Sequence, residues 1–320
     1  MVKNMKLKTH ILLSITILLM SISLSACNSK QEEINTSVIS EQTTLSLQQT
    51  EIETESDSFL VADEPEIITA DYTEMFQSIN GCTVIYDTLE NKYIYFNEDD
   101  CKTRVSPNST FKIVSTLVGL HNQVITSEES KMGYDGTQYP NETWNADLGL
   151  KEAFQYSCVW YYKKLVESTG QDVFQKEVSE LNYGNCDISN WLGNGTDTRA
   201  FWLDSSLKIS PVEQIEIMRS IFEGNTIYSE SEVMILKNIM LTETDGPEKI
   251  YGKTGTGTMG NAWYVGFVEK EDNKIYFAIH LNDNESKQVY GAKAKEIALD
   301  IIYDYIKKQP PIRTVTFFKV

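Results

Sequence analysis

Strand-like segments lie at both ends of the foldable part of this sequence, and helical segments lie between them. Two short apolar runs, 82–87 and 93–96, are separated by a turn and predict an N-terminal hairpin. Two further runs, 261–269 and 274–281, predict a second strand pair. This order predicts an α+β fold in which one antiparallel sheet is flanked by terminal helices and carries an inserted helical subdomain.

Hydrophobic residues between and after these strands recur with helical spacing. The predicted helices are 109–120, 151–168, 211–222, 229–240 and 291–308. The patterned region, 69–309, is long enough for one compact domain with a sizeable core.

A hydroxyl and an amine lie one turn apart at the start of the first predicted helix, on Ser109 and Lys112. Residues three apart on a helix share a face, so Lys112 can take the proton that Ser109 must lose before it attacks a carbonyl. Ser205 and Lys208 repeat the spacing, but that copy runs into Pro211, which does not fit a helix interior. The tetrad alone leaves open that Ser109 only caps a buried helix.

Other short motifs downstream strengthen the interpretation of Ser109 as a nucleophile. Ser157 lies in the predicted helix 151–168 and supplies a second hydroxyl. Lys253-Thr254-Gly255 precedes a strand pair and is expected on a strand, where glycine allows close approach of a ligand to the backbone.

In this order and spacing, the motifs resemble those of the class D (oxacillinase-type) serine β-lactamases of the penicillin-recognising group, in particular the lipoprotein type of Gram-positive anaerobes. The resemblance runs from about Tyr72 to about Lys308. It rests on Pro107-Asn108-Ser109-Thr110-Phe111-Lys112, Trp144-Asn145-Ala146-Asp147, Ser157-Cys158-Val159, Tyr183-Gly184-Asn185, Phe201-Trp202-Leu203, Ile209-Ser210-Pro211 and Lys253-Thr254-Gly255. It implies the penicillin-recognising (β-lactamase/transpeptidase-like) fold and hydrolysis of β-lactam antibiotics, penicillins and cephalosporins, through an acyl-enzyme on Ser109.

The resemblance also implies that carbon dioxide or bicarbonate N-carboxylates Lys112, which then acts as the general base while the Trp202 indole N–H binds the carbamate. No other cofactor is expected. Val159 and Leu203 would surround the amine with apolar groups, and desolvation lowers the pKa of a lysine. Transpeptidases of the superfamily usually have Asn where Val159 stands, so this residue argues against that activity.

The resemblance also implies which residues protonate the leaving group, stabilise the oxyanion and bind the substrate carboxylate. Ser157 would relay a proton to the leaving nitrogen, and the backbone N–H groups of Ser109 and Thr256 would hold the oxyanion. Lys253 and Thr254 would bind the substrate carboxylate.

One departure from the family pattern lies in the last predicted helix. Class D enzymes commonly place an arginine there to bind that carboxylate, and this sequence has Ala294. Lys293 and Lys295 flank it, although an ammonium group cannot reproduce the bidentate contact of a guanidinium. We therefore expect Lys253 and one flanking lysine to share the carboxylate.

The N-terminus, 1–26, has the basic start and short apolar run of a signal peptide. Leu24-Ser25-Ala26-Cys27 resembles a lipobox, which predicts lipid on Cys27 and anchoring to the outer face of a bacterial cytoplasmic membrane. The alternative is an ordinary cleaved signal. Residues 27–68 are polar and aperiodic and predict a disordered tether, and 310–320 form a tail of unknown role.

Charge and metal-ligand content exclude other classes. The formal net charge is −18, from 28 Lys and Arg against 46 Asp and Glu, so nucleic acid is not an expected partner. No metal site is expected, because the sequence has no CxxC and few histidines. The cysteines after Cys27 are expected as free buried thiols: Cys82, Cys101, Cys158 and Cys186.

Four alternatives to a class D enzyme fit parts of the sequence. A class A β-lactamase needs a glutamate where segment 178–182 has Val178. A β-lactam sensor domain would acylate without turnover; known receptors join it to membrane helices and a metalloprotease, patterns that we do not find here. A peptidoglycan D,D-transpeptidase or carboxypeptidase conflicts with Val159. A substrate-binding lipoprotein leaves the Ser109 and Lys112 pair unexplained.

Overall fold

The computed structural model describes residues 64–193, 199–242, 248–258, 260–286 and 289–309. The predicted signal peptide, the lipidation residue Cys27, most of the predicted tether and the tail 310–320 lie outside these residues. None of the described helices is both long enough and apolar enough to cross a bilayer.

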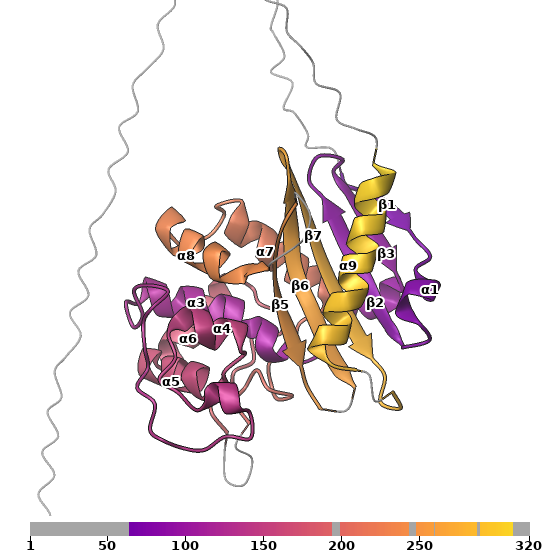
Figure 1. Cartoon of the computed structure of the whole chain (residues 1–320). Coiled ribbons are helices and arrows are strands. Elements are labelled where there is room, and N and C mark those ends of the chain that lie inside the picture. The colour runs from indigo at the N-terminus through magenta and orange to yellow at the C-terminus, as the bar shows by residue number, and fades with distance from the viewer. Residues whose placement is uncertain (1–63, 194–198, 243–247, 259, 287–288, 310–320) are drawn as a thin grey trace, which may run out of the picture. The chain divides into compact units, whose positions relative to one another are not determined.

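One sheet of seven strands, in the order β1-β3-β2-β7-β6-β5-β4, forms the centre of the domain (Figure 1). The strands are β1 Glu66–Thr69, β2 Gly81–Asp87, β3 Lys92–Phe96, β4 Leu241–Thr242, β5 Lys249–Thr256, β6 Asn261–Lys270 and β7 Asn273–Asn282. All neighbours pair antiparallel except β1, which is parallel to β3. The α+β prediction is confirmed, with two corrections: the sheet is mixed, and residues 66–68 belong to it rather than to the tether.

Helices cover both faces of this sheet. They are α1 Thr73–Phe76, α2 Glu98–Lys102, α3 Lys112–His121, α4 Leu150–Gln155, α5 Val159–Thr169, α6 Gln171–Glu180, α7 Pro211–Phe222, α8 Glu230–Met240 and α9 Gly291–Lys308, with 3₁₀ turns η1 Asn108–Phe111 and η2 Glu142–Trp144. Helix α9 packs on β5, β6 and β7 over one apolar core, to which α1 also contributes through Phe76 (Figure 1). The remaining helices build the helical subdomain and a larger core on the opposite face.

Helix ends follow local sequence where a cap is present. At the start of α7 the Ser210 side chain accepts from the Glu213 N–H, the Glu213 carboxylate accepts from the Ser210 N–H, and Pro211 occupies the first turn. The bounds of α7 and α9 are the predicted ones. The cysteines of the described region are free, three of them buried and Cys186 partly so.

The predicted helix 151–168 is wrong in one respect, because it is two helices, α4 and α5, with a break at 156–158. Ser157 in this break has φ 55°, a left-handed conformation that a helix interior does not contain. The Trp144 indole donates to the Tyr156 carbonyl at 2.9 Å, which supplies the break with a hydrogen bond that the helix would otherwise have made. The break turns Ser157 towards the sheet.

Candidate active site

The Ser109 hydroxyl and the Lys112 amine lie together where η1 passes into α3. Ser109 sits in the 3₁₀ turn, so the predicted helix 109–120 becomes an α-helix only at Lys112. The Lys112 Nζ donates to the Ser109 Oγ at 2.9 Å. Ser109 is 8% exposed and Lys112 is completely buried. The amine can therefore exchange a proton with this hydroxyl out of contact with bulk water.

The surroundings of Lys112 favour an uncharged amine. Burial lowers the pKa of Lys112 to about 7, and the Tyr162 ring lies 5.1 Å from its Nζ. Val159, at the start of α5, and Leu203 are only half-buried.

Trp202 adds an unusual donor to this region. Its indole ring stacks on Phe111, the residue before Lys112, at 6.0 Å between centroids. Trp202 is 1% exposed, and its Nε1 is buried with no hydrogen-bond partner among the described residues. A buried N–H without an acceptor is costly and is rare in proteins. This donor would be satisfied by an acceptor introduced next to it.

A second hydroxyl and amine pair lies between the α4–α5 break and the sheet. The Lys253 Nζ on β5 donates to the Ser157 Oγ at 2.6 Å and to the Thr254 carbonyl at 3.0 Å. Burial, together with the nearby charge of Lys112, holds the pKa of Lys253 well below its usual range. Ser157 thus has a proton donor at hydrogen-bond distance.

The edge of β5 lies open beside these pairs. Within the described residues, β4 pairs with β5 at Tyr251 and Ile250, and no strand pairs with this edge of β5 from Gly252 onwards. The Gly257 N–H donates to the Asn261 carbonyl at 2.7 Å, so the alternation of an antiparallel ladder turns the Thr256 N–H away from β6 and towards the open edge.

Gly255 brings the nucleophile turn against this edge. A Cβ at Gly255 would lie 3.0 Å from the Pro107 carbonyl oxygen. The close approach that we predicted for a ligand is therefore made by the chain that leads into Ser109. The backbone N–H groups of Ser109, at the start of η1, and Thr256 are both without a helical or ladder partner by position.

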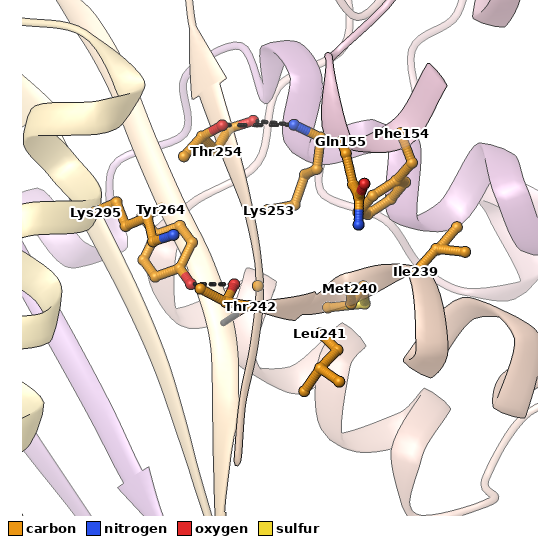
Figure 2. A pocket seen from close by; sticks show the side chains of 11 residues that line it. Phe154, Gln155, Ile239, Met240, Leu241, Thr242, Lys253, Thr254, Tyr264 and Lys295 are labelled. Carbon is orange, nitrogen blue, oxygen red and sulfur yellow. Dashed lines mark hydrogen bonds between the residues drawn. The ribbon is translucent and has the colours of Figure 1, made fainter. Parts of the chain in front are cut away.

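A cavity of about 370 Å³ adjoins the Lys253 side of the site (Figure 2). Its lining includes Phe154 and Gln155 of α4, Lys253 and Thr254 of β5, and Lys295 of α9, but not Ser109 or Lys112. The half-buried Lys295 lies with its Nζ 6.0 Å from the Tyr264 ring centroid, and no hydrogen bond or ion pair of this ammonium occurs within the described region.

The neighbours of Lys295 on α9 do not share this cavity. Lys293 donates to Glu296 at 2.7 Å and to Gln77 at 2.9 Å, and Ala294 is completely buried against the sheet. Of the two flanking lysines, only Lys295 lines the cavity with Lys253.

Two of the sequence motifs, the second serine–lysine tetrad at 205–208 and Tyr183-Gly184-Asn185, stabilise the structure and do not supply reacting groups. The Lys208 Nζ donates to the Ser106 Oγ at 2.8 Å, and the Ser205 Oγ accepts from Asn190, so the competing serine and lysine do not pair. Gly184 and Asn185 hold the same segment: a Cβ on Gly184 would lie 1.9 Å from the Lys208 carbonyl, and the Asn185 N–H donates to that carbonyl at 2.9 Å.

Sequence reasoning missed Asp204, whose carboxylate accepts from three residues in two segments of the site, Asn108 before the nucleophile and Thr258 and Asn261 at the β5–β6 turn. No local pattern could have revealed it, because its side-chain partners lie 54 to 96 residues away.

The chain is similar to a known protein family and to several known proteins. Residues 70–303 match the model of the penicillin binding protein transpeptidase domain. The regulatory protein BlaR1 of Bacillus licheniformis is 34% identical over 72% of this chain, but this chain spans only 38% of its length. The probable β-lactamase YbxI of Bacillus subtilis (strain 168) is 33% identical over 72% of this chain and 82% of that protein.

Solved structures give the same two kinds of neighbour. The class D β-lactamase BAT-2 superposes with a TM-score of 0.68 at 30% identity, over 75% of this chain and 98% of that one. The C-terminal domain of the Bacillus licheniformis BlaR penicillin-receptor superposes with a TM-score of 0.70 at 32% identity, over 77% and 98%. Enzymes and receptors are thus similar to this chain to nearly the same degree.

Proposed function

This chain belongs to the penicillin binding protein transpeptidase-domain family, within its class D β-lactamase-like group, and from that premise we propose that it hydrolyses β-lactam antibiotics through an acyl-enzyme on Ser109. The observation that carries the proposal is the 2.9 Å contact between the Ser109 hydroxyl and a completely buried amine with a pKa of about 7. A serine needs such a neighbouring base to act as a nucleophile.

We infer further that Lys112 acts in its N-carboxylated form. Two groups fit the modification: a lysine whose lowered pKa of about 7 leaves a substantial neutral fraction at neutral pH, and the Trp202 Nε1, a buried donor that lacks an acceptor among the described residues. An indole N–H can only donate, so it suits an anionic partner. A carboxylate on the Lys112 nitrogen would supply an anionic base beside Ser109 both for acylation and for the water that releases the product.

Other residues of the chain serve the remaining steps. Ser157, whose Oγ accepts from the Lys253 Nζ at 2.6 Å, is placed to pass a proton to the leaving nitrogen. The N–H groups of Ser109 and Thr256 are available to the oxyanion, whose developing charge they stabilise. Thr254 and Lys253 border the cavity into which a ligand carboxylate would extend.

Steady hydrolysis of a chromogenic cephalosporin by the purified domain tests this function. The second candidate, a β-lactam sensor, is favoured by the 34% identity to BlaR1 and the TM-score of 0.70 to the BlaR penicillin-receptor domain. An enzyme releases product for many cycles, whereas a sensor gives one equivalent of product and then stops. A burst of one equivalent without further release would assign this chain to the sensors.

Replacing Lys295 by alanine is expected to raise KM for penicillins roughly threefold to tenfold. Lys295 lines the cavity and has neither a hydrogen bond nor an ion pair within the described residues (Figure 2), and a contact made by a half-buried charge is worth less than the 1.5–3 kcal/mol of a fully desolvated one. The effect should shrink at high salt. Lys293→Ala is the matched control, because Lys293 already pairs with Glu296. Equal effects of both substitutions would remove Lys295 from this role.

For location, we propose lipid attachment at Cys27 and anchoring to the outer face of the cytoplasmic membrane, from the short apolar run ending in Leu24-Ser25-Ala26. Mass spectrometry of the mature N-terminus tests this proposal. An unlipidated N-terminus at another residue would contradict it.

A further inference from the structure

The Asp204 carboxylate joins two segments that flank the site. Its Oδ1 accepts from the Asn108 Nδ2 at 3.0 Å and the Asn261 Nδ2 at 3.2 Å. Its Oδ2 accepts from the Thr258 N–H at 2.5 Å and the Thr258 hydroxyl at 2.9 Å. Its backbone N–H returns a bond to the Asn108 Oδ1 at 3.2 Å, so the two residues hold each other at two points.

These contacts reach the chain on both sides of the oxyanion donors. Asn108 precedes Ser109, and Thr258 lies two residues after Thr256. Asn108 has φ 50°, an uncommon conformation for a residue other than glycine, and needs surrounding contacts to hold it. Gly257 lets the segments meet, since a Cβ there would lie 2.4 Å from both Asn108 and Asp204. One carboxylate therefore sets the spacing between the Ser109 turn and the end of β5.

Asp204 also ties in the loop that carries Trp202, which stands two residues before it. Burial alone would raise the pKa of Asp204, but hydrogen bonds from Thr258, Asn108 and Asn261 outweigh it and hold the pKa below its usual range. The group stays ionised at neutral pH as a pure acceptor of four bonds. An asparagine at position 204 would offer a single acceptor oxygen, and its NH₂ group would lie against hydrogen-bond donors that now point at a carboxylate oxygen.

We propose that Asp204 is a positioning residue for acylation: by clamping Asn108 to Thr258 it fixes the Ser109 and Thr256 N–H groups at the separation that an oxyanion requires. The inference rests on the proposed acylation of Ser109. It does not depend on turnover, because enzyme and sensor alike must acylate.

The test is the acylation rate constant of Asp204→Asn, measured by stopped-flow with a chromogenic cephalosporin and by intact mass. We expect a decrease of about ten- to hundredfold, since small displacements of reacting groups have effects of this size. The exchanged pair Asn108→Asp with Asp204→Asn restores a complementary contact and should recover part of the rate. Affinity for a boronic acid, which forms a tetrahedral adduct on serine, should fall with the rate in the single variant.

Asp87→Asn is the matched control. That buried carboxylate, at the end of β2, likewise accepts several hydrogen bonds, among them those from Leu89, Glu90, Asn273 and Tyr305, but none of these lies in the site. It should lower thermal stability and leave acylation unchanged. If Asp204→Asn likewise loses only stability, the proposal is wrong.

A milder variant covers the case in which Asp204→Asn does not fold. Thr258→Ala removes one donor from an exposed position and should slow acylation about threefold. An unchanged rate in this variant would overturn the proposal. If the wild type forms no adduct at all, it is the proposed function that fails.

Discussion

Ser109→Ala is expected to abolish both the covalent adduct with a penicillin and the hydrolysis of a chromogenic cephalosporin, with a loss in kcat on the order of a millionfold. The Ser109 Oγ is the hydroxyl in contact with the Lys112 amine, and an alanine leaves nothing to carry the acyl group. Intact mass spectrometry checks the adduct, and steady-state kinetics check the rate.

The control is Ser205→Ala. Ser205 begins the second tetrad with the same spacing, but Lys208 donates to Ser106 instead. This variant should keep the adduct and the activity of the wild type. An adduct that survives Ser109→Ala and maps to Ser205 would reverse the assignment.

Removing carbon dioxide from the buffer is expected to lower steady turnover at least tenfold, and bicarbonate should restore it. The physical reason is the pKa of about 7 that burial gives Lys112, because only an uncharged amine reacts with carbon dioxide. Activity should accordingly rise with pH through about 7; below that value the neutral fraction falls tenfold per unit. NMR with labelled bicarbonate should show a carbamate carbon.

Trp202→Phe should reproduce the loss by removing the unpaired indole donor. Trp191→Phe, in the same aromatic cluster and stacked on Phe201, is the matched control and should keep the carbamate signal. Val159→Asn should solvate the amine and slow deacylation more than acylation. Full turnover in carbon-dioxide-free buffer with no carbamate signal would leave the plain Lys112 amine as the base.

Local patterns were sufficient wherever the chain's own neighbours decide the structure. The spacing of Ser109 and Lys112 fixed their contact, and Ser210 with Pro211 marked the start of α7, because helix caps and i, i+3 pairs involve residues close in sequence. The strands of the second pair were found for the same reason, since each is a long apolar run.

Distant contacts explain what the sequence did not reveal. The break at Ser157 lies in a segment of helical periodicity. It is held by Trp144, which lies outside that segment, and by Lys253, 96 residues from Ser157 along the chain. Strand β1 has four residues with no alternating pattern and is defined only by pairing with β3. The role of Asp204 depends on its hydrogen bonds with Asn108 and Thr258, which are distant in sequence. In each case tertiary contacts override local propensity.

Because β4 is short, the edge of β5 beside Lys253 has no partner strand among the described residues. In the register of β4 and β5, Met240 and Ile239 would be the next residues to pair along β5, opposite Gly252 and Lys253, but both belong to α8. The sheet is therefore unfinished at this edge because the chain is still helical where it would have to become a strand. An unfinished edge is ordinarily a hazard for aggregation. Here it leaves a strand position beside Lys253 without a partner strand among the described residues, and the proposed function leads us to expect that a substrate with a peptide-like backbone would pair with the sheet there.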